Sequence, residues 1–394
     1  MTHEPHKPWS KQHKKTFKGV SFSLSNSFAQ PLQSDELIEL ARSRGDHQII
    51  DAFLKHSLDY TPNGGSADLR HEISKLYGPK ISADNILVFT GAQVALQTAA
   101  NALVGSRCHS IVFTPCYQSV QEAPVHAGSQ VTKIRLKAEN DWQIHPGEVK
   151  AAIRDNTRYI VINVPSNPAG VLMERSVQQQ LIDIAEKRGI HILSDEVYRL
   201  LEHDARDRLP AMADLYHKGM SVVTMSKPWG ACGVTIGWIA VQDMETKQKL
   251  VDAQYFGTVS PSRASEIQAI MVLRASDTIL EKNMRIIRRN KSLLDGFMEK
   301  YSNLFEWVRP SAGAIGFVKF KGPLSSSELG DELASAGISI KPAYCFADDD
   351  LASGCQEYED YFRIGFGEER MPQALQALER FVEERKHAWQ RSKL

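Results

Sequence analysis

The sequence predicts an α/β protein with a large, mostly parallel sheet between helices and a smaller α+β domain at the C-terminus. Between residues 86 and 240, short β-branched or aliphatic runs alternate with amphipathic stretches. Several of these runs are almost continuously apolar, which is typical of strands covered on both faces. A long stretch of helical periodicity at about 260–304 then leads into further strand-like runs. This order of elements indicates helices on both sides of one sheet, followed by a second domain.

The predicted strands of the large sheet are the runs NILVFT, SIVFT, VTKIRL, YIVINV, IHILSD and SVVTMS. Their β-branched and aliphatic residues favour an extended chain. Intervening stretches such as GAQVALQTAANALVG and VQQQLIDIAEKRG carry apolar residues at helical spacing. Because helices connect the strands, we expect consecutive strands to be parallel.

A single long helix, predicted over about 260–304, bridges the two domains. Strand-like runs follow at 314–320, 338–343 and 361–366, with helices at 325–337 and 371–389. We predict three segments: an N-terminal arm and lid (1–45), a large cofactor-binding domain (46–285) and a small C-terminal domain (286–394).

The composition argues against several classes of function. Basic and acidic residues number 47 each, so no net charge favours nucleic acid or a membrane surface. No run reaches the roughly 18 apolar residues of a membrane span, and the polar, basic N-terminus is not a secretory signal. Five cysteines without C-x-x-C spacing favour a reducing compartment. We expect a cytoplasmic protein without metal, nucleic-acid or membrane partners, and interpret the run KQHKK as a solvated arm.

Residues with reactive or polar side chains follow the predicted strands at their carboxyl ends, where open α/β sheets bind ligands. Four strand ends carry them, at Tyr117, Asn167, Asp195 and Lys227. Ahead of these, the segment TGAQ opens a helix with small residues whose backbone N–H groups form a ready anion site. The residues concerned are Gly91, Ala92 and Gln93.

Each feature alone has an ordinary structural interpretation: an acid can cap a helix, an Asn-Pro turn can simply end a strand, and a lysine can lie on the surface. Together they fit pyridoxal 5′-phosphate (PLP). A lysine forms a Schiff base with its aldehyde, an aspartate keeps its ring nitrogen protonated, and an aromatic side chain stacks on the ring. No G-x-G-x-x-G follows a strand, so the signature of a dinucleotide-dependent dehydrogenase is missing.

From about Val20 to the last helix, the chain resembles the class I and II aminotransferases, which are fold-type I PLP-dependent enzymes. The motifs that carry the resemblance are NVPSNPAG, SDEVY, TMSK, TGAQVAL, DYTPNGGSADLR, PSAGAIGFVKF and YFRIGFG. The resemblance implies a seven-stranded type of sheet in the large domain, an amino acid substrate, and a homodimer with shared active sites.

The motif matches also imply residue roles. Lys227 would form the Schiff base and act as the base, Asp195 would pair with the pyridinium, and Tyr198 would bond the ring's 3-oxygen. The cofactor would be held by the following residues: Tyr60 (from the neighbouring subunit), Gly91, Ala92, Gln93, Tyr117, Asn167, Asp195, Tyr198, Thr224, Ser226, Lys227 and Thr235. The substrate would be bound through its α-carboxylate by Arg363, with Asn167, Ser25 and Phe28 also at its site.

Two departures from the family pattern affect these expectations. Thr235 stands where the family usually has an arginine that grips the phosphate, and this predicts weaker cofactor retention unless another cation such as Arg263 substitutes. The N-terminal G-E-P turn is replaced by LSNSFAQPL, at 24–32, so the lid over the substrate is altered. The sequence does not identify the residues that would bind the substrate's side chain. Phe28, Trp229 and Tyr344 are candidates, but each could equally be a packing residue.

The resemblance favours transamination between an L-amino acid and a 2-oxo acid. The first alternative is PLP-dependent elimination or cyclisation of a hydroxylated arginine, as in the capreomycidine and enduracididine synthases, and a carbon–sulfur lyase is a second. A non-enzymatic transcription regulator of the same fold would need an added helix-turn-helix domain, for which the residues before Val20 give no room.

Overall fold

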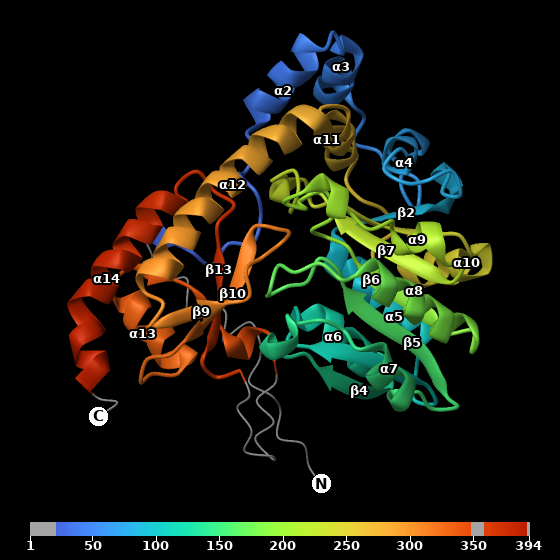
Figure 1. Ribbon diagram of the computed structural model, residues 1–394. Helices are drawn as coiled ribbons and strands as arrows, with labels where there is room; N and C mark the ends of the chain where they lie inside the picture. Colours follow the sequence, from blue (N-terminus) through green and yellow to red (C-terminus); the bar gives the residue numbers. More distant parts are fainter. Residues whose placement is uncertain (1–20, 348–357, 392–394) are drawn as a thin grey trace.

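The computed structural model describes residues 21–347 and 358–391 and confirms the predicted fold class. Its larger part is built on a seven-stranded sheet of order β2-β8-β7-β6-β5-β3-β4 (Figure 1). The strands are β2 (Ile86–Phe89), β3 (His109–Thr114), β4 (Gln130–Arg135), β5 (Thr157–Asn163), β6 (His191–Asp195), β7 (Gly219–Thr224) and β8 (Gly237–Val241). The six strand predictions each correspond to one of these strands, and β8 is an addition.

Strand β8 is antiparallel to both of its neighbours, β7 and β2, whereas β3 to β7 pair in parallel. The connection between β7 and β8 contains no α-helix, only a turn and one 3₁₀ segment at Cys232–Val234. A parallel neighbour needs a long crossover, so this short connection returns the chain antiparallel. The tight return places the Lys227 turn at the edge where the parallel strands end.

Helices cover both faces of this sheet (Figure 1). Helices α5 (Ala92–Leu103), α6 (Gln118–His126) and α10 (Met244–Tyr255) pack on one face. The other face carries α4 (Ala67–Ser74), α7 (Pro146–Ala152), α8 (Arg175–Glu186), α9 (Met212–Leu215) and α11 (Arg263–Arg274). Strands β2, β3 and β7 are buried throughout, as their apolar runs predict, and so is the additional strand β8.

The single long helix predicted over 260–304 is wrong, because α11 ends at Arg274 and α12 (Ser276–Lys300) begins after a break. Ala275, with φ −98° and ψ 11°, leaves the helical conformation between them. Both helices bury an apolar face, so the periodicity runs on through the break and does not reveal it. Helix α12 then extends into the small domain, where it lies beside α14 (Met371–Arg391) (Figure 1).

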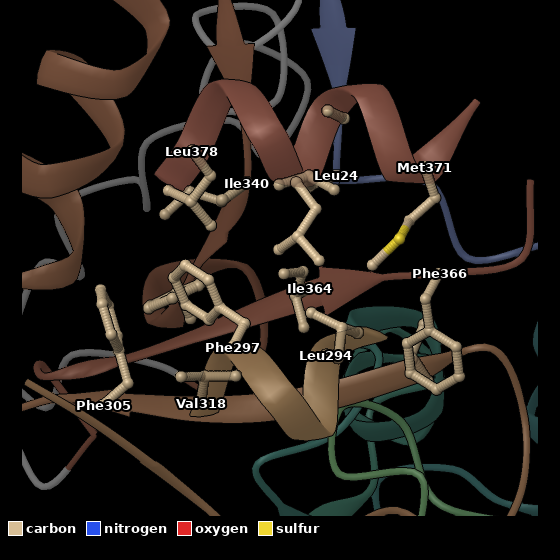
Figure 2. Close-up of a cluster of buried hydrophobic side chains, with 14 of the residues drawn as sticks. Leu24, Leu294, Phe297, Phe305, Val318, Ile340, Ile364, Phe366, Met371 and Leu378 are labelled. Atoms are coloured by element: carbon tan, nitrogen blue, oxygen red, sulfur yellow. The ribbon is translucent and has the colours of Figure 1, made fainter. Parts of the chain in front are cut away.

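The small domain has a four-stranded antiparallel sheet of order β12-β13-β10-β9. Its strands are β9 (Phe305–Trp307), β10 (Ile315–Phe320), β12 (Lys341–Pro342) and β13 (Tyr361–Gly365), and α13 (Ser326–Ser335) packs beside them. Figure 2 shows the core between this sheet and the helices α12 and α14, with Phe297, Ile364 and Leu378 among its side chains.

The N-terminal segment joins this small domain. Strand β1 (Phe22–Ser23) pairs with β11 (Ile338–Ser339), and Leu24 lies in the small-domain core (Figure 2). Helices α2 (Ser34–Ser43) and α3 (His47–Lys55) then lead to the large sheet. The domain boundaries at 45/46 and 285/286 stay a prediction; the second falls inside α12.

Within residues 21–347 and 358–391, no helix has the length and apolar character needed to cross a membrane. The same part of the chain contains no group of three or more His, Cys, Asp or Glu side chains that could hold a metal ion. The described cysteines Cys108, Cys116, Cys232 and Cys345 are free thiols. Cys355 and the run KQHKK lie outside the described residues.

Candidate active site

The carboxyl ends of β6 and β7 bring the three expected catalytic residues together. Asp195 is the last residue of β6 and is only 2% exposed. Lys227 follows β7 by three residues, and its Nζ lies 5.8 Å from the centre of the Tyr198 ring. The same Nζ donates a hydrogen bond to the Oγ of Ser27, at 2.9 Å. A half-buried lysine, a buried carboxylate and a buried phenol therefore lie close together, as their positions at the strand ends predict.

Burial changes the pKa of both charged groups. It raises the pKa of Asp195 to about 7, against the opposing effects of the Val197 N–H and of the Lys227 charge. It lowers the pKa of Lys227 to about 8, and the charge of Arg363 lowers it further. An amine with this pKa is partly neutral near physiological pH, and the buried carboxylate would be stabilised by a cation placed against it.

Arg363 is held rigidly between the two domains. Its Nη1 donates to Oδ1 of Asn167 (2.9 Å), and its Nη2 donates to the carbonyl oxygen of Ser25 (2.7 Å). The guanidinium lies over the ring of Phe346, 5.0 Å from its centre, and the residue is 4% exposed. Because Oδ1 of Asn167 accepts from Arg363, the Nδ2 of Asn167 remains as the donor for a ligand.

The expected anion site lies at the start of α5. Gly91 has φ 95°, a conformation that favours glycine, and precedes the first helical residue, Ala92. A Cβ at Gly237 would lie 2.7 Å from the backbone nitrogen of Ala92, so β8 packs directly against this helix start. Nearby in the sheet, Thr224 ends β7, and its Oγ1 lies 3.2 Å from the Oγ of Ser226.

The side chain of Gln93 is bonded to the expected ring-stacking residue. Its Nε2 donates to the hydroxyl of Tyr117 (2.9 Å) and to the Oγ of Ser119 (3.0 Å). Tyr117 is half-buried and immediately precedes α6. Gln93 therefore fixes the position of the aromatic ring, and its backbone N–H is the group that an anion would meet.

The segment that replaces the G-E-P turn is tied to the lysine turn. The Ala29 N–H donates to the Lys227 carbonyl (3.1 Å), and the Leu32 N–H donates to the Gly230 carbonyl (3.2 Å). A Cβ at position 230 would lie 2.0 Å from the backbone carbonyl oxygen of Gln30, so only glycine lets the two backbone segments come this close. These contacts hold Ser27 next to Lys227.

Ser27 was not predicted as a partner of Lys227, although its neighbours Ser25 and Phe28 were expected at the site. Ser25 contributes its carbonyl to Arg363, and its side chain bonds Ser339 (Oγ to Oγ, 3.0 Å). Phe28 is half-buried. The only signal for Ser27 in the sequence was its place inside the altered lid.

Trp229 is not a pocket residue. It is fully buried, and its Nε1 donates to the Oγ of Ser276 (2.7 Å), which begins α12. Its ring packs against Trp238, with 6.1 Å between centroids. Tyr344 is half-buried and packs against the cluster that joins the two domains.

The residue in place of the family's arginine offers no charge at the phosphate position. Thr235 is exposed, has φ 54°, and its hydroxyl lies within bonding distance of the Gly233 and Cys232 carbonyls (3.3 and 3.5 Å). Arg263, the cation named as an example of a substitute, donates to the Tyr60 carbonyl (3.1 Å) and so lies with the Tyr60 segment.

We expect Thr235→Arg to bind PLP more tightly, because a charge-assisted hydrogen bond to phosphate replaces a neutral one. The gain should be about tenfold in the dissociation constant, measured by titrating PLP into cofactor-free protein. Thr235→Gln is the matched control, since it adds length without charge and should bind like the wild type. Equal affinity of the arginine variant and the wild type would contradict this account of position 235.

The described residues fit PLP. Among them, the buried hydroxyl of Tyr198 and the Nε of Arg363 have no well-formed hydrogen-bond partner. These two donors lie near the buried carboxylate of Asp195 and the amine of Lys227, whose pKa is lowered. The N-terminus of α5 has no side-chain cap. A ring with a cationic nitrogen, an oxygen substituent and a phosphate would satisfy such a set of groups.

Comparison with known proteins gives the family. The family model for aminotransferase class I and II matches residues 45–378. An aspartate aminotransferase of Pyrococcus horikoshii is 26% identical over 378 residues, covering 90% of this chain and 93% of that protein. A PLP-dependent aminotransferase of Streptococcus suis superposes with a TM-score of 0.88 at 25% identity, covering 97% of this chain and 99% of that one.

Other relatives have more distant sequences or shorter matches. An arginine–pyruvate transaminase of Pseudomonas aeruginosa is 28% identical over 198 residues, which is 48% of this chain and 50% of that protein. A double mutant of the aspartate aminotransferase of Thermus thermophilus superposes with a TM-score of 0.82 at 20% identity, covering 97% of each chain, and so supports the fold. The family match spans most of the chain, and the chain therefore belongs to the class I and II aminotransferases as a PLP-dependent enzyme of fold type I.

Proposed function

We propose that this aminotransferase moves the amino group of an L-amino acid to a 2-oxo acid, with Lys227 as the base and Arg363 as the carboxylate-binding residue. The observation that carries the proposal is that the half-buried Lys227 lies with the buried side chains of Asp195 and Arg363 near the carboxyl edge of the sheet. Each of the three side chains suits a different role, because the amine can move a proton, the carboxylate can hold a positive charge, and the guanidinium can bind the substrate.

When bound, PLP supplies a cationic conjugated ring that accepts the electron pair left on the substrate's Cα after deprotonation. Arg363 would orient the substrate by bonding its α-carboxylate, while Asn167 and the Ser25 carbonyl keep the guanidinium in place. The neutral Nζ of Lys227 would remove the Cα proton and later return a proton to the reacting atoms.

Asp195 would hold positive charge at the cofactor's ring nitrogen. Its carboxylate is buried and fixed by the Val197 N–H (3.3 Å), so little reorganisation is needed as charge moves in the ring. Tyr198 and the Nδ2 of Asn167 would bond the ring's 3-oxygen. The phosphate would lie at the start of α5, close to Thr224 and Ser226.

The test is the dependence of turnover on an amino acceptor. With the PLP-loaded enzyme freed of excess PLP and an amino acid alone, we expect about one equivalent of 2-oxo acid per site, and repeated turnover only after a 2-oxo acid acceptor is added. Repeated turnover without an acceptor would contradict transamination and point instead to elimination or cyclisation. The names of the relatives, which are aminotransferases, do not favour that alternative.

A second proposal is that two copies of the chain form a dimer in which Tyr60 completes the partner's phosphate site. Two adjacent segments, 54–60 and 255–259, expose large apolar side chains, including Leu58 (96%), Tyr60 (83%) and Phe256 (89%). Two hydrogen bonds connect these segments: the Thr61 hydroxyl donates to the Pro261 carbonyl, and the Arg263 guanidinium donates to the Tyr60 carbonyl. So much exposed apolar surface is typical of an interface.

Light scattering should give a molar mass of about twice the 44.1 kDa of one chain. A monomer that retains activity would contradict the shared site.

A further inference from the structure

A small cavity lies on the face of the large sheet that α8 covers. Helix α8 packs against β6 (Figure 1), and the cavity lies between this helix, the ends of β5 and β6, and the segment 199–210. Its volume is about 20 Å³, which is room for one particle of about the size of a water molecule. The polar side chains in its wall are Gln178, Ser194, Glu196, Arg199 and Glu202.

The alternation along β6 separates this cavity from the catalytic groups. Leu193 packs in the core on the α5 side of the sheet, and Ile192 packs in the core on the α8 side. Because successive strand residues point to opposite faces, Asp195 lies on the side of Leu193, whereas Ser194 and Glu196 lie on the side of Ile192. The cavity is therefore a second site, although Glu196 directly follows Asp195 in the chain.

Two buried side chains in the cavity wall each have an oxygen without a well-formed hydrogen bond. Within the described residues, Oε1 of Gln178 and Oε2 of Glu196 have no partner, and both residues are only 5% exposed. The Gln178 amide cannot be turned round without a loss, because its Nε2 donates to the Pro210 carbonyl (3.0 Å). Buried acceptors are normally satisfied, so both oxygens require a donor or a cation in the cavity.

The carboxylate of Glu196 is bonded to neutral donors. Its Oε1 accepts from the Met212 N–H (2.8 Å) and from the Ser221 hydroxyl (2.9 Å). Burial raises the pKa of Glu196, and the charge of Arg199 and the neutral donors oppose this effect only in part. A counter-ion in direct contact with Oε2 would stabilise the buried charge.

The two arginines near the cavity are engaged elsewhere. Nη1 of Arg199 donates to the Leu209 carbonyl (2.6 Å). Nε of Arg208 donates to Oε2 of Glu202 (2.8 Å), whose Oε1 accepts from the Leu200 N–H (3.2 Å). The second carboxylate of the cavity is thus already paired, and Glu196 is the one whose free oxygen lacks a counter-ion.

A monovalent cation of about the size of water suits these groups. Hard cations take oxygen ligands, and the cavity offers the Glu196 carboxylate, the Gln178 amide and the Ser194 hydroxyl. The half-buried Leu209 and Pro210 in the wall leave a side from which water can complete the coordination. A divalent ion would leave positive charge buried near Arg199, and a water molecule alone would leave the carboxylate without a counter-ion.

We propose that the cavity is a binding site for K⁺ or NH₄⁺, with Gln178 and Glu196 as ligands, and that the bound ion stabilises the strand end that carries Asp195. The site goes beyond the proposed function, because it involves neither the substrate nor a partner subunit. No role was predicted for Gln178 or Glu196 from the sequence, since the two meet only through the packing of α8 on β6.

The first test is thermal melting of the PLP-loaded protein in the chlorides of K⁺, NH₄⁺ or tetramethylammonium, at one ionic strength of about 0.1 M so that screening is the same. Tetramethylammonium is too large for the cavity. We expect K⁺ and NH₄⁺ to raise the melting temperature by about 2–4 °C relative to it. Glu196→Gln and Gln178→Met should lose this difference, because the first removes the charge and the second a ligand oxygen.

Gln180→Met is the matched control. Gln180 is exposed on the same helix, where its Nε2 donates to the Ser176 carbonyl (3.3 Å), so its loss should leave the ion dependence unchanged. Equal melting temperatures of the wild type in K⁺ and tetramethylammonium would overturn the inference. So would an ion effect that persists in both cavity variants.

Rubidium locates the ion directly and does not depend on the folding of any variant. Rb⁺ replaces K⁺ in oxygen sites and scatters X-rays anomalously. Crystals of the PLP-loaded wild type grown in rubidium chloride should show an anomalous peak between Gln178 and Glu196. A peak with the weight of a water molecule and no anomalous signal would show that solvent fills the cavity, and the inference would then be wrong.

Discussion

Lys227→Ala should lose transamination almost completely, with kcat lower by about 10³- to 10⁴-fold. The variant removes the amine that anchors the cofactor and moves the Cα proton. Within the described residues, the side chain bonded to that amine is the Ser27 hydroxyl, which is too weak a base to replace it. The measurement is single-turnover formation of 2-oxo acid with the variant saturated with both PLP and amino acid, so that weaker cofactor binding does not obscure the chemical step.

Two further results qualify this prediction. Methylamine added to Lys227→Ala should restore part of the rate, since a small amine fits the space that the side chain leaves and supplies the missing base. Ser27→Ala should lose far less, about tenfold or below, because it removes only a positioning hydrogen bond. A Lys227→Ala variant that keeps more than a few per cent of the wild-type rate would refute the role of this lysine.

Asp195→Asn should lower kcat by roughly 10²- to 10³-fold, because a neutral amide cannot hold positive charge at the ring nitrogen. The fold should survive, since asparagine is nearly isosteric with aspartate and can still accept from the Val197 N–H. Unchanged kcat with PLP fully bound would contradict the pairing of Asp195 with the cofactor.

The same substitution should stabilise the cofactor-free protein at alkaline pH. The folded pKa of Asp195 is about 7, raised from 3.8, so its ionisation opposes folding and stability falls as pH rises between these values. The difference corresponds to roughly 4 kcal/mol. In urea denaturation, Asp195→Asn without PLP should therefore be more stable than the wild type at pH 8 and close to it at pH 4.5. A constant difference at both pH values would show that Asp195 does not titrate in this way.

The sequence predicts the large sheet and the fold class well, and it places the expected catalytic residues at one edge of that sheet for a physical reason. The strands are short, apolar and separated by helices, and their carboxyl ends must meet at one edge of a parallel sheet. The positions of Asp195 and Lys227 follow from that rule, as does the place of Asn167 beyond β5. The role of Arg363 comes from the family resemblance, because nothing in YFRIGFG by itself says what the arginine faces.

Features that depend on distant contacts could not be predicted. Ser27 meets Lys227 only because the N-terminal segment is bonded to the lysine turn, 200 positions away in the chain. The alternation in ISIKPA places Lys341 on the other face of the strand from Ile338 and Ile340, but the neighbouring elements decide which of the two faces packs in the core. The sequence predicted neither the break at Ala275 nor the antiparallel direction of β8, because an apolar pattern indicates which residues are buried but not the direction in which the chain runs.

The most direct test of the account is to find which lysine carries the cofactor. The PLP-loaded protein would be reduced with borohydride, digested, and mapped by mass spectrometry. Lys227 is half-buried and Lys341 is buried, and burial lowers the pKa of both amines to about 8, so chemistry alone does not choose between them. We predict a pyridoxyl group on Lys227, and none at that site in Lys227→Ala. Labelling of Lys341 or another lysine in the wild type, with Lys227 unmodified, would contradict the assignment.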